Sequence, residues 1–166
     1  MPGQNRTKTL VVTSMLAALI FVITFLVAIP VPSTSAYVNI GDSVIYCAGL
    51  LVGGPWAAAA AGIGSMLADW AVGVPIYMPA TLIIKALMGF VCAKIAKNGK
   101  LPLFILGCVT GGAIMVLGYG AYEVFFMNGW GYAVVTLPGN LIQWAGGVAA
   151  AIALYFPVKR VKGLIG

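Results

Sequence analysis

Four ionisable residues lie inside or at the edges of otherwise apolar segments: Asp42, Asp69, Lys85 and Glu123. A charge in the hydrocarbon core of a membrane is unfavourable by about 2.5–3.5 kcal/mol, so such residues are rare and usually mark a functional site. Carboxylates and an ammonium group can hold a polar ligand through ion pairs and hydrogen bonds. The alternative is a buried ion pair, such as Asp69 with Lys85, that only holds helices together.

Polar and aromatic residues repeat at helical spacing around these charges, which places them on shared helix faces. They are Thr81, one turn before Lys85; Tyr119, Tyr122 and Phe126 around Glu123; and Asn140, Gln143, Trp144 and Gly147. Aromatic walls with a few convergent polar groups are typical of a site for a small, flat, hydrogen-bonding ligand. For Trp70, Tyr77, Trp130 and Tyr132, an aromatic belt at the membrane interface explains the sequence equally well.

The composition indicates an integral membrane protein. Of the 166 residues, 62% are hydrophobic and 7% are charged, and the mean hydropathy is +1.08. We therefore expect a single membrane domain over residues 1–166, powered by ion coupling or by another subunit. The net charge of +6 comes from basic residues at segment ends, beside anionic lipid, so we expect no nucleic-acid partner.

The residue types also bear on catalysis and metal binding. The chain has no histidine, and Cys47, Cys92 and Cys108 lie within apolar segments without CxxC spacing. We therefore expect no metal site, no disulfide and no cofactor in this chain. Ser65 follows a glycine as in some intramembrane proteases, but no evident base could activate it. The expectation is a protein without catalytic residues.

Six apolar segments must position the charged side chains, and each is predicted to be a helix. Their ranges are 10–29, 43–52, 56–74, 76–93, 101–127 and 138–156. Segment 43–52 is short for a straight crossing of a hydrocarbon core about 30 Å thick. Residues 128–136, which include Gly129, Trp130, Gly131 and Tyr132, are predicted to form an interfacial loop with aromatic anchors.

Lysine and arginine form three clusters, at positions 6–8, 94–100 and 159–162. By the positive-inside rule all three are cytoplasmic, which requires an even number of crossings between them. Four crossings followed by two satisfy this condition, so the short segment 43–52 is predicted to cross. We expect an all-α integral membrane protein with six transmembrane helices and cytoplasmic N and C termini. The four embedded charges then fall in the external half, where the ligand pocket is expected.

Four motifs lie between residues 39 and 85: Asn39-x-Gly41-Asp42, Gly53-Gly54-Pro55, Gly64-Ser65-x3-Asp69 and Pro79-x-Thr81-x2-Ile84-Lys85. With the predicted topology, they resemble the substrate-binding S component of energy-coupling factor (ECF) transporters, most closely the riboflavin-type branch. The resemblance covers nearly the whole chain, although the C-terminal third matches mainly in topology. With these motifs, the expected ligand-binding residues are Asn39, Asp42, Asp69, Thr81, Lys85, Tyr122, Glu123, Asn140, Gln143 and Trp144.

The resemblance implies a substrate-capture subunit in the plasma membrane of a prokaryote. Such S components bind a vitamin at the external face and associate with a transmembrane T subunit and two cytosolic ATPases, which use ATP and magnesium. The T subunit is contacted through small residues on the first span. The matching positions here are Ser14 and Ala18, with Ala17 beside them. The chain has no Gly-x4-Gly-Lys-Ser/Thr motif, in keeping with ATP hydrolysis in separate subunits.

The expected site suits a small heteroaromatic ligand such as hydroxymethylpyrimidine or pyridoxine, and it would also suit riboflavin. A rival of a different class is a self-sufficient ion-coupled carrier or channel, in which Asp69, Lys85 and Glu123 form a relay. A carrier usually needs charged groups along its whole path. The expected cytoplasmic half of this chain has none apart from its ends, which favours the S-component interpretation.

Overall fold

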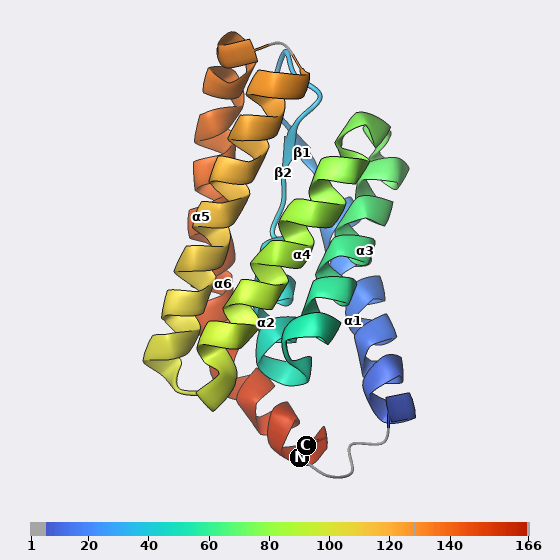
Figure 1. Cartoon of the computed structure of the whole chain (residues 1–166), viewed down its shortest axis with the longest axis vertical. Helices are drawn as coiled ribbons and strands as arrows, with labels where there is room; N and C mark the ends of the chain where they lie inside the picture. Colours follow the sequence, from blue (N-terminus) through green and yellow to red (C-terminus); the bar gives the residue numbers. More distant parts are fainter. Residues whose placement is uncertain (1–5, 128, 166) are drawn as a thin grey trace.

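The computed structural model describes residues 6–127 and 129–165 and is almost entirely helical (Figure 1). The helices are α1 (Arg6–Leu26), α2 (Gly41–Val52), α3 (Gly54–Val72), α4 (Met78–Ile95), α5 (Leu101–Phe126) and α6 (Gly129–Ile165). Two short 3-10 helices, η1 (Pro75–Tyr77) and η2 (Ala96–Asn98), flank α4, and strands β1 (Ile29–Pro30) and β2 (Tyr37–Val38) form a hairpin between α1 and α2. The six predicted α-helices are confirmed.

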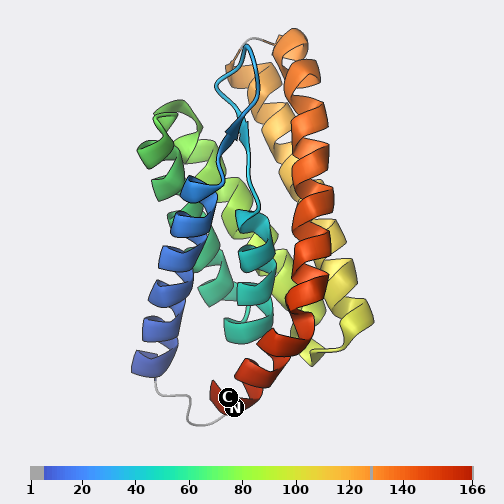
Figure 2. The same ribbon diagram turned by 180° about the vertical axis from the view of Figure 1, so that it is seen from behind.

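Among the described residues, four helical segments are long and apolar enough to cross a membrane: Arg6–Leu26, Pro75–Asn98, Leu101–Phe126 and Gly129–Gly163. Helix α2 is apolar but has only 12 residues, which corresponds to about 18 Å at 1.5 Å per residue. The hairpin continues from its N-terminal end along the long axis of the molecule (Figure 2). A short buried helix and the extended segment before it therefore follow one another along this axis.

The predicted interfacial loop at 128–136 is wrong for residues 129–136, which are helical; Asn128 lies outside the described residues. Helix α6 begins at Gly129 and continues through Pro138, which was expected to start the sixth span. Apolar residues fill positions 133–135 and 137, and a backbone in lipid must satisfy its hydrogen bonds within the segment. Proline is tolerated inside membrane helices because neighbouring helices and side chains satisfy the backbone groups that it leaves free. The aromatic residues of this stretch therefore lie on a helix and not on a loop.

Small residues allow α3 to pack closely against both α1 and α4. A Cβ atom added at Gly64 would lie 2.5 Å from the carbonyl oxygen of Ala17 in α1. A Cβ atom at Gly62 would lie 2.7 Å from the carbonyl oxygen of Leu82 in α4. Both contacts involve backbone atoms, so a larger side chain at either glycine would push two helices apart.

Helix α2 lies at the centre of the bundle, where α1, α3, α4 and α6 contact it. Its residues from Gly41 to Leu50 are buried, and Ile45, Tyr46 and Ala48 have no exposed surface. The start of α1 and the end of α6 lie at one end of the molecule, and the hairpin lies toward the other end (Figures 1 and 2). The acidic residue at the first turn of α2, Asp42, therefore faces the half of the protein that contains the hairpin.

Candidate ligand-binding site

A cavity with an empty volume of about 410 Å³, including its open mouth, lies between the hairpin and the helices. Its lining residues come from α1, the hairpin region and α3 to α6, and most of them are polar or aromatic. They are Thr24, Ala36, Tyr37, Asn39, Ser65, Asp69, Tyr77, Thr81, Lys85, Tyr119, Glu123, Asn140 and Gln143. Segments far apart in the sequence therefore contribute to one polar site inside an apolar bundle.

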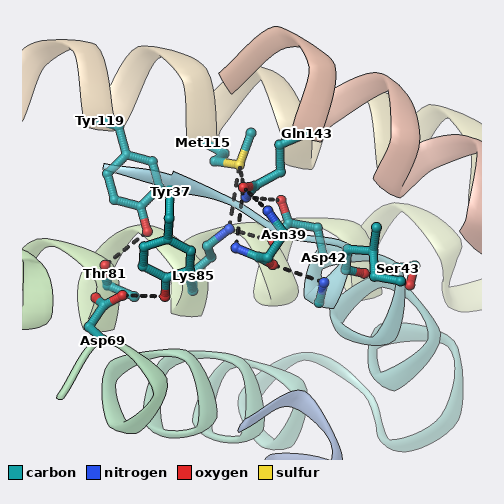
Figure 3. A network of polar contacts seen from close by, with 12 residues as sticks. Tyr37, Asn39, Asp42, Ser43, Asp69, Thr81, Lys85, Met115, Tyr119 and Gln143 are labelled. Atoms are coloured by element: carbon teal, nitrogen blue, oxygen red, sulfur yellow. Dashed lines mark hydrogen bonds and ion pairs between the residues drawn. The ribbon is translucent and has the colours of Figure 1, made fainter. Parts of the chain in front are cut away.

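Lys85 forms a buried ion pair with Asp42, which ties α4 to the first turn of α2 (Figure 3). The side chains of Lys85 and Asp42 are 4% and 1% exposed. The Lys85 Nζ atom also lies 3.4 Å from the Met115 sulfur of α5. The sequence left open a pairing of Lys85 with Asp69, but the structure pairs the lysine with Asp42. A buried charge without a partner is strongly unfavourable. Each of the two residues therefore needs the other in order to be buried as a charged group in this fold.

The Gln143 side chain connects the ion pair to the hairpin (Figure 3). Its Nε2 atom donates to Asp42 Oδ2 at 2.9 Å, and its Oε1 atom accepts from the backbone N–H and the Nδ2 of Asn39, at 2.9 and 3.2 Å. Asn39 Oδ1 in turn accepts from the backbone N–H of Gly41 at 2.8 Å, at the start of α2. One glutamine on α6 thus holds the chain where it passes from the hairpin to the central helix.

Asp69 lies at another part of the cavity, where Tyr37 of the hairpin donates a 2.6 Å hydrogen bond to its Oδ1 atom (Figure 3). Burial raises the pKa of the Tyr37 hydroxyl far above its ordinary value, and the Asp69 carboxylate raises it further. The phenol therefore stays protonated and acts as the donor. The other carboxylate oxygen of Asp69, Oδ2, is buried, and no donor among residues 6–127 and 129–165 meets the distance and angle criteria of a hydrogen bond to it.

Glu123 is 1% exposed, and both of its carboxylate oxygens accept hydrogen bonds from hydroxyl groups. Tyr77 donates to Oε1 at 2.9 Å, and Thr136 of α6 donates to Oε2. Nearby, the hydroxyl groups of Thr81 and Tyr119 lie 2.9 Å apart. The donors to this carboxylate are therefore neutral hydroxyl groups. Within the described residues, no cation takes part in its hydrogen bonds.

The structure brings seven of the ten predicted ligand-binding residues to the cavity wall: Asn39, Asp69, Thr81, Lys85, Glu123, Asn140 and Gln143. Asp42 lies behind Lys85 and does not line the cavity. The Tyr122 hydroxyl instead donates to the carbonyl oxygen of Ile76, and Trp144 packs against α5 at Gly112, where a Cβ atom would lie 1.7 Å from its ring. Helical spacing identified residues on the helix faces that line the cavity, but it did not indicate how far each side chain reaches.

Several lining residues were not predicted, above all Tyr37 and Ala36 of the hairpin region and Thr24 of α1. Their positions depend on the hairpin folding back over the bundle, and no periodic pattern marks that. Tyr77, for which belt and pocket were both open, is 4% exposed and lines the cavity. Trp70 and Trp130 are 67% and 76% exposed, as residues of an interfacial belt would be.

The predicted docking residues on α1 divide into two groups. Ser14 and Ala18 are exposed, and the Ser14 hydroxyl donates within its own helix, to the carbonyl oxygen of Leu10 at 3.0 Å. Ala17 instead packs against the core, beside Gly64 of α3. Because consecutive helical positions point about 100° apart, a residue adjacent in sequence need not share the exposed face.

Comparison with known proteins identifies relatives along nearly the whole chain. Residues 4–160 match the family described as "ECF-type riboflavin transporter, S component". A protein of Pyrococcus woesei, described as "Uncharacterized protein in gap 3'region", is 34% identical over 145 residues, which cover 87% of this chain and 97% of that protein.

A solved structure shares the fold: the S component for biotin from an ECF-type ABC transporter, at a TM-score of 0.68. The two chains are 19% identical, and the match covers 98% of this chain and 95% of the other. The family and this structural neighbour are transporter components and not enzymes. The apolar helices and the family match together indicate a multi-pass membrane protein, and the chain belongs to the ECF-type riboflavin transporter S-component family.

Proposed function

We propose that this chain is the substrate-capture subunit of an ATP-driven ECF importer for a water-soluble vitamin or vitamin precursor. The observation that carries the proposal is the cavity itself, in which polar groups from six segments converge beneath a hairpin in a membrane-protein fold of this family. A site of this kind is typical of small-molecule capture, because aromatic walls and a few hydrogen-bonding groups select one ligand.

In the proposed orientation the protein lies in the plasma membrane of a prokaryote with both termini cytoplasmic. Arg6 and Lys8 begin α1, and Lys159, Arg160 and Lys162 lie near the end of α6, at the same end of the molecule (Figure 1). The positive-inside rule places that end on the cytoplasmic side. The cavity then opens toward the external half, beneath the hairpin.

The ligand that we favour is a small heteroaromatic molecule such as hydroxymethylpyrimidine or pyridoxine. Tyr37, Tyr77 and Tyr119 provide aromatic surface, and Thr81, Asn140 and Gln143 provide hydrogen-bonding groups. This combination of aromatic surface and a few hydrogen-bonding groups suits a single substituted ring. Riboflavin is the alternative, and the name of the matching family favours it.

Asn140 provides a direct test of the cavity as the binding site. Asn140→Ala is expected to weaken ligand binding about 5- to 30-fold, since it removes an amide hydrogen bond worth about 1–2 kcal/mol. Thermal unfolding should be unchanged, because the side chain is only partly buried. The dissociation constant is measured from quenching of tryptophan fluorescence. Leu141→Ala, on an exposed neighbouring position of α6, is the control; equal affinities for both variants would remove Asn140 from the site.

The proposed partners are a transmembrane T subunit and two cytosolic ATPases, with ATP and magnesium used only by the latter. The proposed T-subunit contact is the exposed face of α1 that contains Ser14, Ala18 and, one turn further, the 41% exposed Val22. Small residues on a membrane helix allow another helix to approach closely. Ala17 is not part of this face, since it packs inward.

A bulky residue on this face should separate transport from capture. Ala18→Trp is expected to reduce vitamin uptake by cells at least about 10-fold, because a large side chain prevents close helix approach. Ligand binding by the purified variant should equal that of the wild type. Leu106→Trp, at a 52% exposed position on α5, is the matched control. Normal uptake by Ala18→Trp would contradict the docking role of this face.

Mass spectrometry of small molecules that co-purify with the chain tests the proposal directly. We expect one vitamin or precursor to co-purify in stoichiometric amounts and to rebind the stripped protein. Liposomes that contain the chain alone should not accumulate this compound. Accumulation driven only by a pH or sodium gradient would instead identify a self-sufficient carrier and refute the capture function.

A further inference from the structure

Basic and acidic side chains are separated along the long axis of this protein. The chain has nine lysines and arginines and three acidic residues. All three acidic residues belong to the cavity or to the ion pair behind it, and Lys85 is the basic residue beside them. The other basic residues lie at the opposite end of the molecule, where α1 begins, α4 is joined to α5 and α6 ends (Figure 1): Arg6, Lys8, Lys94, Lys97, Lys100, Lys159, Arg160 and Lys162. That end therefore has many cations and no acidic side chain.

A hydrogen bond brings one of these cations, Lys159 of α6, to the turn that precedes α5. The hydroxyl group of Tyr155 donates to the carbonyl oxygen of Gly99 at 2.6 Å. The Nζ atom of Lys159, about one helical turn further along α6, donates to the same hydroxyl oxygen at 3.3 Å. The turn at Gly99 also contains the exposed Lys97 and Lys100. Lysines from α6 and from the turn between α4 and α5 therefore gather around one contact.

Protein groups do not neutralise these three lysines. Within residues 6–127 and 129–165, the ion pair is Lys85 with Asp42, which lies toward the hairpin. The hydrogen-bond partner of Lys159 is a neutral hydroxyl group. Like charges close together repel each other, so an anion among them is favourable. A phosphate group suits this place, because its oxygens accept charge-assisted hydrogen bonds from several ammonium groups.

The length of α6 places its last turns at the membrane surface. The helix has 37 residues, which corresponds to about 55 Å, whereas the hydrocarbon core of a bilayer is about 30 Å thick. Helix α6 contains Pro157, and its last part turns across the end of the bundle (Figures 1 and 2). A proline bends a membrane helix because it removes a backbone hydrogen bond. The basic residues of this part therefore lie at the level of the lipid headgroups.

An exposed aromatic side chain lies directly before these cations and favours a lipid over an acidic protein as the partner. Phe156 is 65% exposed, and its ring packs against Tyr155 at a centroid distance of 5.2 Å. Lys159 and Arg160 follow Phe156 at spacings of three and four residues, so they share its helix face. An apolar side chain followed by cations on one face matches a phospholipid, whose acyl chain adjoins an anionic phosphate group.

We propose that Lys97, Lys100 and Lys159 form a binding site for the phosphate group of an anionic phospholipid. An acyl chain of the same lipid packs against Phe156. The bound lipid then joins α6 to the turn between α4 and α5, next to the hydrogen bond between Tyr155 and Gly99. This site lies at the opposite end of the molecule from the hairpin, so its failure would leave the proposed capture function untouched.

The first test compares two lipids with the same acyl chains, dioleoyl phosphatidylglycerol and dioleoyl phosphatidylcholine. Native mass spectrometry of the full chain in a neutral detergent measures the two dissociation constants. We expect the anionic lipid to bind at least about 10-fold more tightly. It should also raise the midpoint of thermal unfolding, because a ligand that binds only the folded state stabilises it. Glycerol 3-phosphate and inorganic phosphate, at the same concentration as the lipid, should not displace it.

The triple variant Lys97→Gln, Lys100→Gln and Lys159→Gln locates the site. We expect it to weaken binding of phosphatidylglycerol at least about 20-fold and to leave binding of phosphatidylcholine unchanged. The three side chains are exposed, so the variant should unfold at the same temperature as the wild type in the absence of lipid.

A second triple variant, Arg6→Gln, Lys8→Gln and Lys94→Gln, is the matched control. It removes the same charge from the same end of the molecule but at other positions. Arg6 and Lys8 begin α1, and the Lys94 side chain lies beside Gly54, where α3 begins. This variant should change the affinity for phosphatidylglycerol by less than about 3-fold.

Three results would each overturn the lipid site. Equal binding of the two lipids by the wild type, or equal weakening by the two triple variants, would show that only the general charge of this end attracts lipid. Displacement of the lipid by inorganic phosphate or glycerol 3-phosphate would identify a site for a small soluble anion. Normal lipid binding by the first triple variant, together with lost association with the ATPase subunits, would identify a contact with an acidic protein surface.

Discussion

Lys85→Met is expected to lower the free energy of unfolding by about 3–5 kcal/mol, because it leaves the Asp42 carboxylate buried without its cation. Methionine has nearly the shape of lysine, so packing is preserved and the loss reports the charge. The Asp42 side chain is 1% exposed, which leaves solvent little access to compensate. Equilibrium unfolding in mixed micelles measures the change.

The double variant Lys85→Met with Asp42→Asn should recover most of that loss, since no unpaired charge remains and Gln143 can still donate to the asparagine oxygen. Lys94→Met, at an exposed position near the end of α4, is the matched control and should change stability by less than about 0.5 kcal/mol. If the single and double variants are equally unstable, the two residues do not form the ion pair that the geometry indicates.

Gln143→Met should destabilise the protein by about 3 kcal/mol or more, because it leaves Asp42 Oδ2 and two N–H groups of Asn39 without partners. The same change should release the chain between the hairpin and α2. Hydrogen exchange of the Asn39 backbone amide is therefore expected to accelerate strongly, since that amide donates to Gln143 at 2.9 Å.

Ligand binding should weaken together with this loss of protection, because Asn39 and Gln143 both line the cavity. Leu141→Ala, two positions earlier on α6 and exposed, provides the control for exchange and for stability. Unchanged protection of the Asn39 amide in Gln143→Met would show that the hairpin is held in place by other contacts.

Hydropathy, helical spacing and lysine distribution predicted the membrane class and all six helices. Each of these properties is local or is a sum over neighbouring residues, so it can be read directly from a single sequence. Helical spacing also selected Thr81, Glu123, Asn140 and Gln143, which the fold brings to one cavity. The start of α6 was not predicted, because glycine, tryptophan and tyrosine in 129–132 are typical of a loop, whereas the backbone there is helical.

The sequence by itself determined that this is a membrane protein with four embedded ionisable residues. It also determined that partner groups must offset the unfavourable free energy of burying these charges. Only the tertiary structure decided the pairing: Lys85 with Asp42, and Asp69 with Tyr37 of the hairpin. The physical reason is that an ion pair or hydrogen bond depends on distances of about 3 Å between atoms, which the packing of distant segments sets and no periodicity encodes.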